Sequence, residues 1–217
     1  QMNLSPMGGI LRSRTQALSP DGQCKTFSQE ANGFVQGEGV GVIILMGLRD
    51  AESHHKKIRA VIRGSAINHD GASAGLTAPN EAAQIDVIRS ALDNSGVDSQ
   101  EVSYIETHGT GTVLGDPIEI NALNFVYGEN RKDPIWVGAV KSNIGHLEAA
   151  AGIASIIKTV LALENKIIPP HLNFKTPNTH IDWENIPFKV PSEPIVWAAQ
   201  GKEPCAAVSS FGMSGTN

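Results

Sequence analysis

The sequence predicts an α/β fold built on parallel strands, and two consecutive units of similar design support this prediction. Residues 102–128 run from a short apolar segment, VSYIET, through a polar glycine-rich loop, HGTGTVLG, into a helix-forming segment, DPIEINALNFVYG. Residues 135–165 repeat this order with IWVGAV, KSNIG and the long segment HLEAAAGIASIIKTVLALEN. Strand, loop and helix in repeated succession are typical of parallel strands joined by crossover helices. Because 41% of the 217 residues are apolar, the chain can also bury a substantial core.

The segments before the first unit are expected to be irregular or extended. Residues 1–37 show no periodicity, and Ser19-Pro20-Asp21-Gly22 predicts a turn. The continuous apolar run VGVIILMGL at 40–48 predicts a strand buried on both faces. The segment IRAVIRGSAIN at 58–68 alternates in part between apolar and polar residues, which predicts further β structure.

A helix and a final strand complete the expected elements. The segment at 69–80 is expected to be a loop. Asn80 or Pro79 then opens a helix that runs to about Asn94 and is closed by Gly96. After the second unit, six prolines between residues 169 and 194 predict an extended, irregular segment. The apolar residues of EPCAAVSSFG at 203–212 then predict the last strand.

Composition limits the classes of partner and compartment. A formal net charge of −5 without a basic stripe argues against nucleic acid as the main partner. The two cysteines, Cys24 and Cys205, form no CxxC pattern, which suits a reducing compartment, so we expect a cytoplasmic protein. No membrane span is predicted, because the run at 40–48 is too short and Lys158 interrupts the apolar helix of the second unit. The last residues end inside a Gly/Ser-rich loop, so we expect a piece of a longer protein.

Two histidines follow the two predicted strands, and each lies in a setting that suggests chemistry. The carboxyl ends of parallel strands meet at one edge of a sheet, so His108 and His146 are expected to lie close together. Gly109 and Gly111 would let the backbone approach a ligand, although a hydrogen-bonded histidine in a tight turn explains His108 equally well. His146 is placed at the start of a helix, where the helix dipole would keep its ring neutral.

Three charged residues accompany the histidines. Asp116 and Glu119 fit a capping box at the start of the first unit's helix, which explains Asp116 better than catalysis does. Lys141 ends the second strand and needs an acidic partner, for which Glu119 is the natural candidate. We therefore predict a Lys141–Glu119 ion pair within about 4 Å.

A metal site and an internal nucleophile are both disfavoured by the sequence. His69-Asp70, His108, Asp116 and His146 could in principle bind a metal ion, but no HxH, HxxxH or HExxH spacing occurs. Cys24 and Cys205 are interpreted as small buried hydrophobes, and no GxSxG elbow presents a serine. The chemistry suggested by the histidines therefore lacks a nucleophile within this chain.

The motifs together resemble one enzyme family. THGTGTVLGDPIE and KSNIGHLEAAAG resemble the two histidine motifs of the β-ketoacyl synthases, and GFVQGEGVGVIIL, INHDGASAGLTAPN, PPHLNFKTPNTHIDW and VSSFGMSGTN extend the resemblance along the chain. In detail the sequence is similar to the ketosynthase domain of a modular type I polyketide synthase. The resemblance implies a thiolase-like fold with α-β-α-β-α layers. Residues 1–217 would be the C-terminal portion of a single ketosynthase domain, with the end of the first half and most of the second.

The resemblance also implies a reaction. A cysteine that precedes Gln1, outside this chain, would take an acyl group from an acyl carrier protein. A malonyl unit on a second carrier protein would lose carbon dioxide, and its carbanion would attack the acyl thioester. His108 and His146 would stabilise the enolate oxygen, and Lys141 would position them through Glu119.

Further residues and partners follow from the same resemblance. Thr110 and Thr112 match positions that bond the phosphopantetheine arm. The Met213 N–H matches half of an oxyanion hole and, with Phe211 and Gly212, an acyl gate, although many relatives carry an aromatic residue at the methionine. No cofactor or metal would be bound, since substrates arrive on the phosphopantetheine of acyl carrier proteins. Carrier protein domains, the rest of the synthase polypeptide and a second copy in a homodimer are the expected partners.

Three alternatives to a chain-elongating polyketide ketosynthase remain open. A non-elongating ketosynthase that relays acyl chains is the first, and it is disfavoured because that class often lacks the first histidine, here His108. The condensing domain of a fatty-acid synthase is the second. A metal-dependent hydrolase is the third, and the spacing of its candidate ligands disfavours it.

Overall fold

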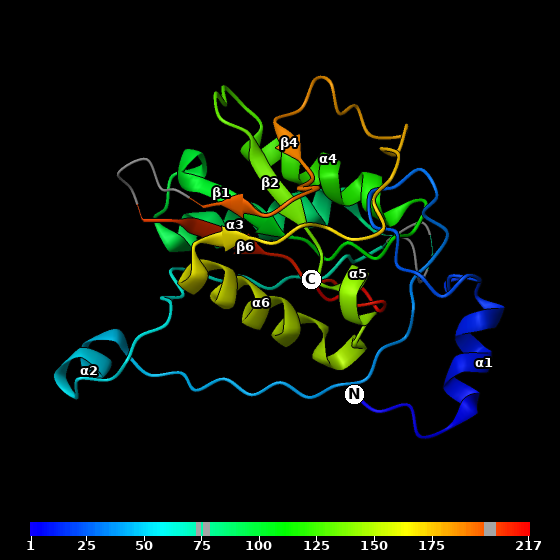
Figure 1. The fold of residues 1–217 in the computed structure, drawn as a ribbon, viewed down its shortest axis with the longest axis horizontal. Helices are drawn as coiled ribbons and strands as arrows, with labels where there is room; N and C mark the ends of the chain where they lie inside the picture. The colour runs from blue at the N-terminus through cyan, green and yellow to red at the C-terminus, as the bar shows by residue number, and fades with distance from the viewer. Residues whose placement is uncertain (73–74, 76–78, 198–202) are drawn as a thin grey trace.

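The computed structural model describes residues 1–72, 75, 79–197 and 203–217. Its centre is a parallel four-stranded sheet in the order β4-β2-β1-β6, which confirms the predicted parallel sheet (Figure 1). The strands are β1 (Val102–Glu106), β2 (Ile135–Gly138), β4 (Phe188–Lys189) and β6 (Cys205–Val208). Strand β6 confirms the last predicted strand. The predicted loop at 69–80 lies partly outside the described residues.

Helices cover both faces of this sheet. Helices α3 (Glu81–Ser95) and α4 (Gly115–Tyr127) contribute apolar side chains to the larger core cluster, which includes Ile105 of β1. On the opposite face, Tyr104 of β1 joins Ala162 of α6 (Ala151–Asn165) in a second cluster. Figure 1 shows α6 running along this second face. Each apolar face of β1 is therefore buried by a different layer of helix.

The predicted ends of helix α3 are confirmed. The side chain of Asn80 caps its first turn and accepts hydrogen bonds from the N–H groups of Ala82 and Ala83, at 3.1 and 3.3 Å. Gly96 closes the helix in the left-handed conformation with φ of 63°, which glycine adopts without the cost that a Cβ imposes. Helix α4 was also predicted, but its first turn is not closed by an acidic side chain. Its cap is Leu114, which makes no side-chain hydrogen bond.

The second unit differs from prediction between its strand and its long helix. The expected loop at 141–145 contains a short helix, α5 (Lys141–Ile144). A 3₁₀ turn, η2 (Glu148–Ala150), precedes α6, so His146 lies five residues before that helix. The placement of His146 at a helix start was therefore wrong. The cause is a pairing that the local pattern does not reveal, because His146 forms a parallel bridge with Gln36 and is held in extended backbone.

The first part of the chain contains helices that were not predicted. Residues 6–14 were expected to be irregular and instead form α1 (Pro6–Arg14). Its start carries recognisable signals, since proline occupies the first turn and the Ser5 side chain accepts a hydrogen bond from the Met7 N–H at 3.3 Å. Helix α2 (Leu48–Ser53) follows the apolar run. The predicted turn at Ser19–Gly22 is confirmed, with φ of 71° at Gly22.

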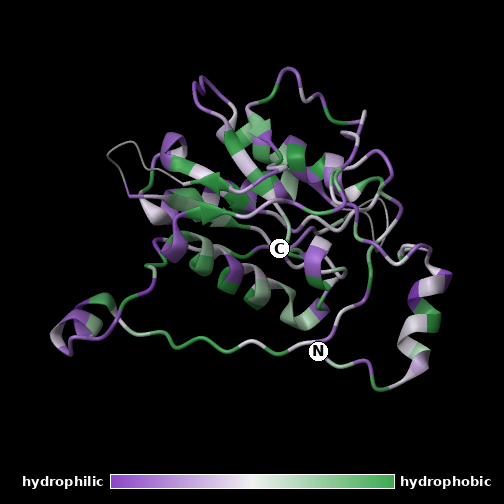
Figure 2. Cartoon of the chain, in the orientation of Figure 1, coloured by the Kyte–Doolittle hydropathy of each residue, from purple (hydrophilic) through white to green (hydrophobic). Residues whose placement is uncertain are grey.

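The two predicted β segments at 40–48 and 58–68 were wrong. Residues 40–47 are extended, but no strand of the described part of the chain pairs with them. Val42 and Ile44 are 81% and 92% exposed. Figure 2 shows the apolar run as a separate stretch that passes below α6. Residues 58–68 likewise form no strand, and Ile67 is 77% exposed. An apolar run predicts a preference for burial, but a strand also needs a neighbour with which to exchange hydrogen bonds.

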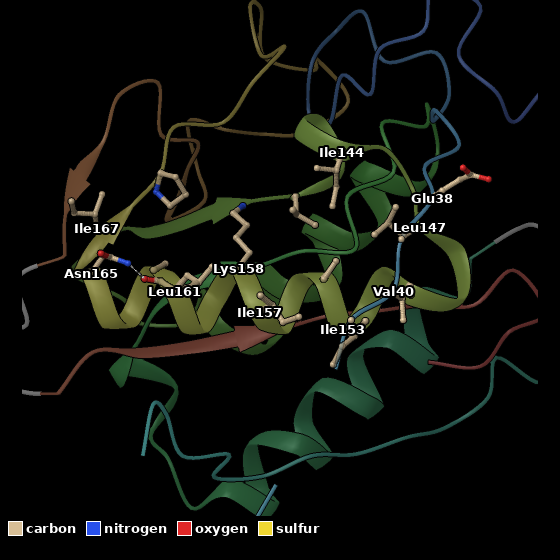
Figure 3. Close-up of a pocket in the computed structure, with 17 residues that line it drawn as sticks. Glu38, Val40, Ile144, Leu147, Ile153, Ile157, Lys158, Leu161, Asn165 and Ile167 are labelled. Atoms are coloured by element: carbon tan, nitrogen blue, oxygen red, sulfur yellow. Dashed lines mark hydrogen bonds between the residues drawn. The ribbon is translucent and has the colours of Figure 1, made fainter. Parts of the chain in front are cut away.

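A groove follows the same side of α6. Its volume is about 680 Å³, and Gly39–Gly41 face the helix across it. Figure 3 shows Leu147, Ile153, Ile157 and Leu161 along its wall. We call it the α6 groove.

The proline-rich segment at 169–194 is largely irregular, as predicted, and β4 lies within it. Immediately beyond it, β5 (Ile195–Val196) pairs antiparallel with β3 (Ile167–Ile168), a small sheet that was not predicted. Among the described residues, no helix has the length and apolar character needed to cross a membrane.

Candidate active site

The structure brings the two predicted histidines together. The ring centroids of His108 and His146 are 5.3 Å apart, with an interplanar angle of 81°. Phe34 packs 5.0 Å from the His146 ring, and Phe211 packs 5.5 Å from the His108 ring. Both histidines line a cavity of about 350 Å³. The other residues that line this cavity are Ala66, Ile67, Glu148, Ala151, Ser210, Phe211, Gly212, Thr216 and Asn217.

His108 is held as a neutral ring with a defined tautomer. Its Nδ1 accepts a hydrogen bond from the Phe211 N–H at 3.2 Å. Burial lowers the pKa of His108 well below its usual value, and the nearby Lys141 and His146 lower it further. Because Nδ1 is an acceptor, the single ring proton is on Nε2. His108 therefore presents an Nε2–H donor at neutral pH.

His146 reaches the same state by a different contact. Its Nδ1 accepts a hydrogen bond from the Glu148 N–H at 2.9 Å. Burial lowers the pKa of His146 to about 3, with smaller contributions from the charges of Lys141 and Arg12. The predicted neutral ring is thus supported, but burial rather than a helix dipole is its main cause. Two neutral imidazoles, each with Nε2–H available, lie side by side.

Glu119 organises the loop that carries His108. Its Oε1 accepts a hydrogen bond from the His108 N–H at 2.7 Å, and its Oε2 accepts one from the Gly109 N–H at 2.8 Å. Burial raises the pKa of Glu119 to about 7, although these two hydrogen bonds favour the ionised form. Gly109 itself has φ of 45°, and a Cβ there would lie 2.6 Å from the Cβ of Ala139. Glycine at position 109 therefore allows the loop after His108 to pack closely against Ala139.

Asp116 likewise binds main-chain N–H groups of neighbouring loops. Its carboxylate accepts hydrogen bonds from the Phe27 N–H at 2.7 Å and the Gly111 N–H at 3.0 Å. Burial raises the pKa of Asp116 to about 7. The predicted capping box was wrong, because both carboxylates bond main-chain groups outside the first turn of α4. A sequence spacing that fits a cap serves here to join α4 to two loops.

Lys141 does not form the predicted ion pair. In the described part of the chain, no ion pair within 4 Å joins it to Glu119, and its Nζ donates instead to the His108 carbonyl oxygen. Glu119 accepts from the N–H of the same residue. Glu119 therefore binds the main-chain N–H of His108, and Lys141 binds its main-chain carbonyl oxygen. Burial lowers the pKa of Lys141, and the charge of Glu119 is the strongest influence that raises it.

The two threonines of the first loop lie near the start of α4. Thr110 Oγ1 and Thr112 Oγ1 are 2.9 Å apart and share a hydrogen bond. Thr112 Oγ1 also accepts a hydrogen bond from the Gly115 N–H at 3.2 Å. Both side chains are half-buried. Their hydroxyls are therefore ordered by each other and by the helix start.

The segment at 211–213 lies beside His108. The Phe211 N–H donates to His108, and the Gly212 N–H donates to the Thr216 carbonyl oxygen at 2.6 Å. The Met213 N–H makes no hydrogen bond to any described residue, and the Met213 side chain is 64% exposed. Within the described chain, the Met213 N–H is therefore the one of these three that has no hydrogen-bond acceptor.

The cysteines and the candidate metal ligands were disfavoured by the sequence. Cys24 is buried, and its Sγ accepts a hydrogen bond from the Val35 N–H at 3.1 Å. Burial raises the pKa of both Cys24 and the half-buried Cys205, which makes their thiolates scarce near neutral pH. Within the residues that the structure describes, no three His, Cys, Asp or Glu side chains are grouped so that they could hold a metal ion.

Two acidic residues near the histidines were missed by the sequence analysis. Glu106 is fully buried at the end of β1, two residues before His108. A charged residue at the end of an apolar strand was the available signal. Glu148, whose N–H orients His146, has an unfavourable positive φ of 47°. No local pattern marks that conformation.

The comparisons with known proteins identify a family. The family described as "Beta-ketoacyl synthase, C-terminal domain" matches residues 59–175, and the corresponding N-terminal domain family matches residues 1–51. The Spectinabilin polyketide synthase system protein NorA' of Streptomyces orinoci is 51% identical over 98% of this chain and 6% of its own length. One of the phenolphthiocerol/phthiocerol polyketide synthase subunits of Mycobacterium tuberculosis is 52% identical over 93% of this chain and 11% of its own length.

Solved ketosynthases share the fold. The ketosynthase from module 6 of the bacillaene synthase of Bacillus subtilis 168 superposes with a TM-score of 0.97 at 45% identity, over 100% of this chain and 40% of that chain. The oxazolomycin ketosynthase domain of Streptomyces albus JA3453 gives a TM-score of 0.94 at 34% identity, also over 100% and 40%. These likenesses confirm the thiolase-like fold. The chain spans 40% of these solved ketosynthases and about a tenth or less of the two curated relatives. The chain belongs to the β-ketoacyl synthase family.

Proposed function

We propose that this chain is the C-terminal portion of a polyketide synthase ketosynthase that catalyses decarboxylative condensation of an acyl thioester with a malonyl-type thioester. The observation that carries the proposal is the pair of neutral histidines, His108 and His146, whose Nδ1 atoms both accept main-chain hydrogen bonds. Relatives named as polyketide synthases support the class of synthase.

The histidine pair suits the carbanion step. When a malonyl thioester loses carbon dioxide, negative charge develops on its carbonyl oxygen. Two Nε2–H donors directed at that oxygen would stabilise the enolate without giving up their protons, because neutral imidazole is a very weak acid. Preorganised donors of this kind typically contribute about 3–4 kcal/mol each. The enolate carbon then attacks the acyl thioester, forms the carbon–carbon bond and expels the thiolate.

Lys141 and Glu119 act on this step through His108. Glu119 binds its N–H and Lys141 its carbonyl oxygen, so both fix the position of the ring. The positive charge of Lys141 also lowers the pKa of both histidines and keeps them neutral. Both residues are therefore positioning residues in this proposal.

As the family resemblance implies, the acyl group is assigned to a cysteine outside this chain. Burial raises the pKa of Cys24 and Cys205, which makes both poorly suited to nucleophilic attack. The Met213 N–H would bind the oxygen of that acyl thioester, with Phe211 and Gly212 lining the acyl entrance. Thr110 and Thr112 would bond the phosphopantetheine arm. No cofactor is required, since the substrates carry their own phosphopantetheine.

The partners belong to the same proposal. Acyl carrier protein domains would deliver both substrates, the rest of the synthase polypeptide would supply the nucleophile, and a homodimer would form through the ketosynthase. A cytoplasmic location is proposed from the two free cysteines. The presence of His108 favours elongation over acyl relay, and the names of the relatives favour a polyketide synthase over a fatty-acid synthase.

The test is His146→Ala in a full-length ketosynthase that contains this chain. Mass spectrometry would follow acyl loading of the enzyme and formation of the β-ketoacyl product. Loading should persist while condensation is lost, since loading needs the oxyanion hole and condensation needs the enolate donors. His54→Ala, at an exposed position, is the matched control. Condensation by His146→Ala at the parent rate would contradict the proposal.

A further inference from the structure

Glu106 is a buried charge that the proposed reaction does not yet use. It ends strand β1, is 0% exposed, and lies two residues before His108. A carboxylate in such a place needs partners that replace its water. Its Oε2 accepts hydrogen bonds from the Tyr104 hydroxyl at 2.5 Å and the Lys158 Nζ at 2.6 Å, and its Oε1 accepts one from the Val140 N–H at 2.6 Å. Both carboxylate oxygens of Glu106 are therefore bound by hydrogen-bond donors, one of which is a charged lysine.

Lys158 reaches this centre from the other layer of the fold. It lies on α6, and Figure 3 shows its side chain extending from the helix along the wall of the α6 groove. Its Nζ also lies 5.7 Å from the centroid of the Tyr104 ring. The Lys158 side chain is 17% exposed, whereas that of Glu106 is 0% exposed. The lysine thus supplies the main counter-charge and ties α6 to the end of β1.

The third contact leads directly to the site. Val140, whose N–H is bound by Glu106, is the residue before Lys141 and caps α5. Lys141 in turn donates to the His108 carbonyl oxygen. Glu106 therefore fixes two neighbouring points at once, the end of the strand that leads to His108 and the turn that presents Lys141.

Charge gives Glu106 a second connection with Lys141. In the described part of the chain, no carboxylate lies within ion-pair distance of this lysine, although it is almost fully buried. Burial lowers the pKa of Lys141, and Glu119 and then Glu106 are the leading influences that raise it. The other ionisable groups that face Lys141 are Cys24, Asp116, His108 and His146.

We propose that Glu106, held in place by Lys158, is a positioning residue of the site that fixes the turn before Lys141 by binding the Val140 N–H and places a second negative charge near Lys141, beyond ion-pair distance. This inference rests on the proposed function for its catalytic meaning, but its geometry does not. The network links three segments, namely β1, the β2–α5 turn and α6. It would keep Lys141 charged and directed at His108 while substrates enter and leave.

The first test is Glu106→Gln within a full-length ketosynthase that contains this chain. Nuclear magnetic resonance of ¹³C-labelled lysine would follow the titration of Lys141. Loss of the carboxylate charge should lower its midpoint by about one pH unit, as expected for removal of a nearby opposite charge. Glu164→Gln is the matched control, because Glu164 pairs with Arg59 at 2.9 Å on the protein surface. An unchanged Lys141 midpoint in a folded Glu106→Gln protein would overturn the proposal.

A second variant keeps the proposal testable if Glu106→Gln does not fold. Lys158→Met removes the counter-charge, and amide hydrogen exchange would then report on the Val140 N–H. Exchange should accelerate at least about tenfold, because the carboxylate that binds this group is no longer held. Lys158→Arg should restore most of the protection. Equal exchange rates of the Val140 N–H in Lys158→Met and in the parent would contradict the proposed role of Glu106.

The pH dependence of the condensation rate distinguishes this inference from the proposed function. In a full-length ketosynthase, Glu106→Gln should move the alkaline limb of the condensation rate to lower pH, following the Lys141 midpoint. A purely structural role would lower the rate at every pH without moving that limb, which would overturn the positioning role. A parent enzyme that does not condense would refute the proposed function, while the Lys141 titration would still decide the role of Glu106.

Discussion

The main chain of His108 is held by two side chains that do not touch its ring. Glu119 accepts its N–H, and Lys141 donates to its carbonyl oxygen. The ring is fixed separately by the Phe211 N–H. Because three groups from three different segments fix one residue, small changes in any of them should move the ring relative to His146. Such positioning matters, since a displacement of about 1 Å can cost 100-fold in rate.

A double-mutant cycle tests this arrangement. Lys141→Ala and Glu119→Ala should each depress condensation strongly, and the double variant should lose little more, because residues that act as a unit are not additive. The rates would be measured in a full-length ketosynthase. The control cycle uses Arg59→Ala and Glu164→Ala, an exposed ion pair that should leave the rate unchanged. Additive losses at Lys141 and Glu119 would show that they do not act through the same residue.

Helices α3 and α4 show how element boundaries follow from local chemistry in one case and not in the other. Asn80 and Gly96 end α3 as their residue types require. At α4 the same rules assign Asp116 to a cap, yet its carboxylate binds Phe27 and Gly111. A carboxylate at a helix start satisfies whichever N–H groups the tertiary fold places closest.

The cap of α3 gives a prediction at this level. Asn80→Ala removes the acceptor of two N–H groups and also a donor to the Asp70 carbonyl oxygen. The free energy of unfolding should fall by about 1 kcal/mol. Urea denaturation followed by circular dichroism would measure it. Asp86→Ala, on the exposed face of the same helix, should change stability by less than about 0.5 kcal/mol. A loss no larger than that of the control would contradict the capping role.

The same elements show what could be predicted from the sequence. The parallel sheet, α3, α6 and the meeting of His108 with His146 follow from patterns within one segment and from the geometry of parallel strands. Lys141 was expected to need an acidic partner, but its acceptor is a carbonyl oxygen. Every segment carries such an oxygen, so no residue type identifies it. The extended backbone of His146 likewise depends on Gln36, which is 110 positions away in the sequence.

The strand predicted at 40–48 shows how a local pattern can fail at the scale of the whole molecule, because no strand of the described residues pairs with this segment. Its residues have the apolar, β-branched character of a buried strand, and they are extended, but their side chains are largely exposed. Together with α6 they border the α6 groove, whose volume is about 680 Å³. The described part of the chain therefore leaves apolar side chains exposed along one side of α6, and the chain spans only 40% of the solved ketosynthases that share its fold.

This surface should bind an apolar dye. We expect 8-anilinonaphthalene-1-sulfonate to fluoresce with the folded chain, because the α6 groove offers an apolar wall. Ile157→Asp, within the groove, should reduce the fluorescence several-fold. Ile10→Asp, at an exposed position on α1, should leave it unchanged. Equal fluorescence in the parent and Ile157→Asp would place the binding elsewhere.

The state of the two histidines in the folded protein tests the central claim most directly. Nuclear magnetic resonance of ¹⁵N-labelled histidine reports both the tautomer and the titration of each ring. His108 and His146 should both carry the proton on Nε2 and stay neutral as the pH falls from 8 to about 5, since burial lowers the pKa of His146 to about 3 and that of His108 well below 6.5. In the urea-unfolded chain both rings should titrate near ~6.5, as histidine does in water. Protonation of either ring near pH ~6.5 in the folded protein, or a proton on Nδ1, would contradict the account.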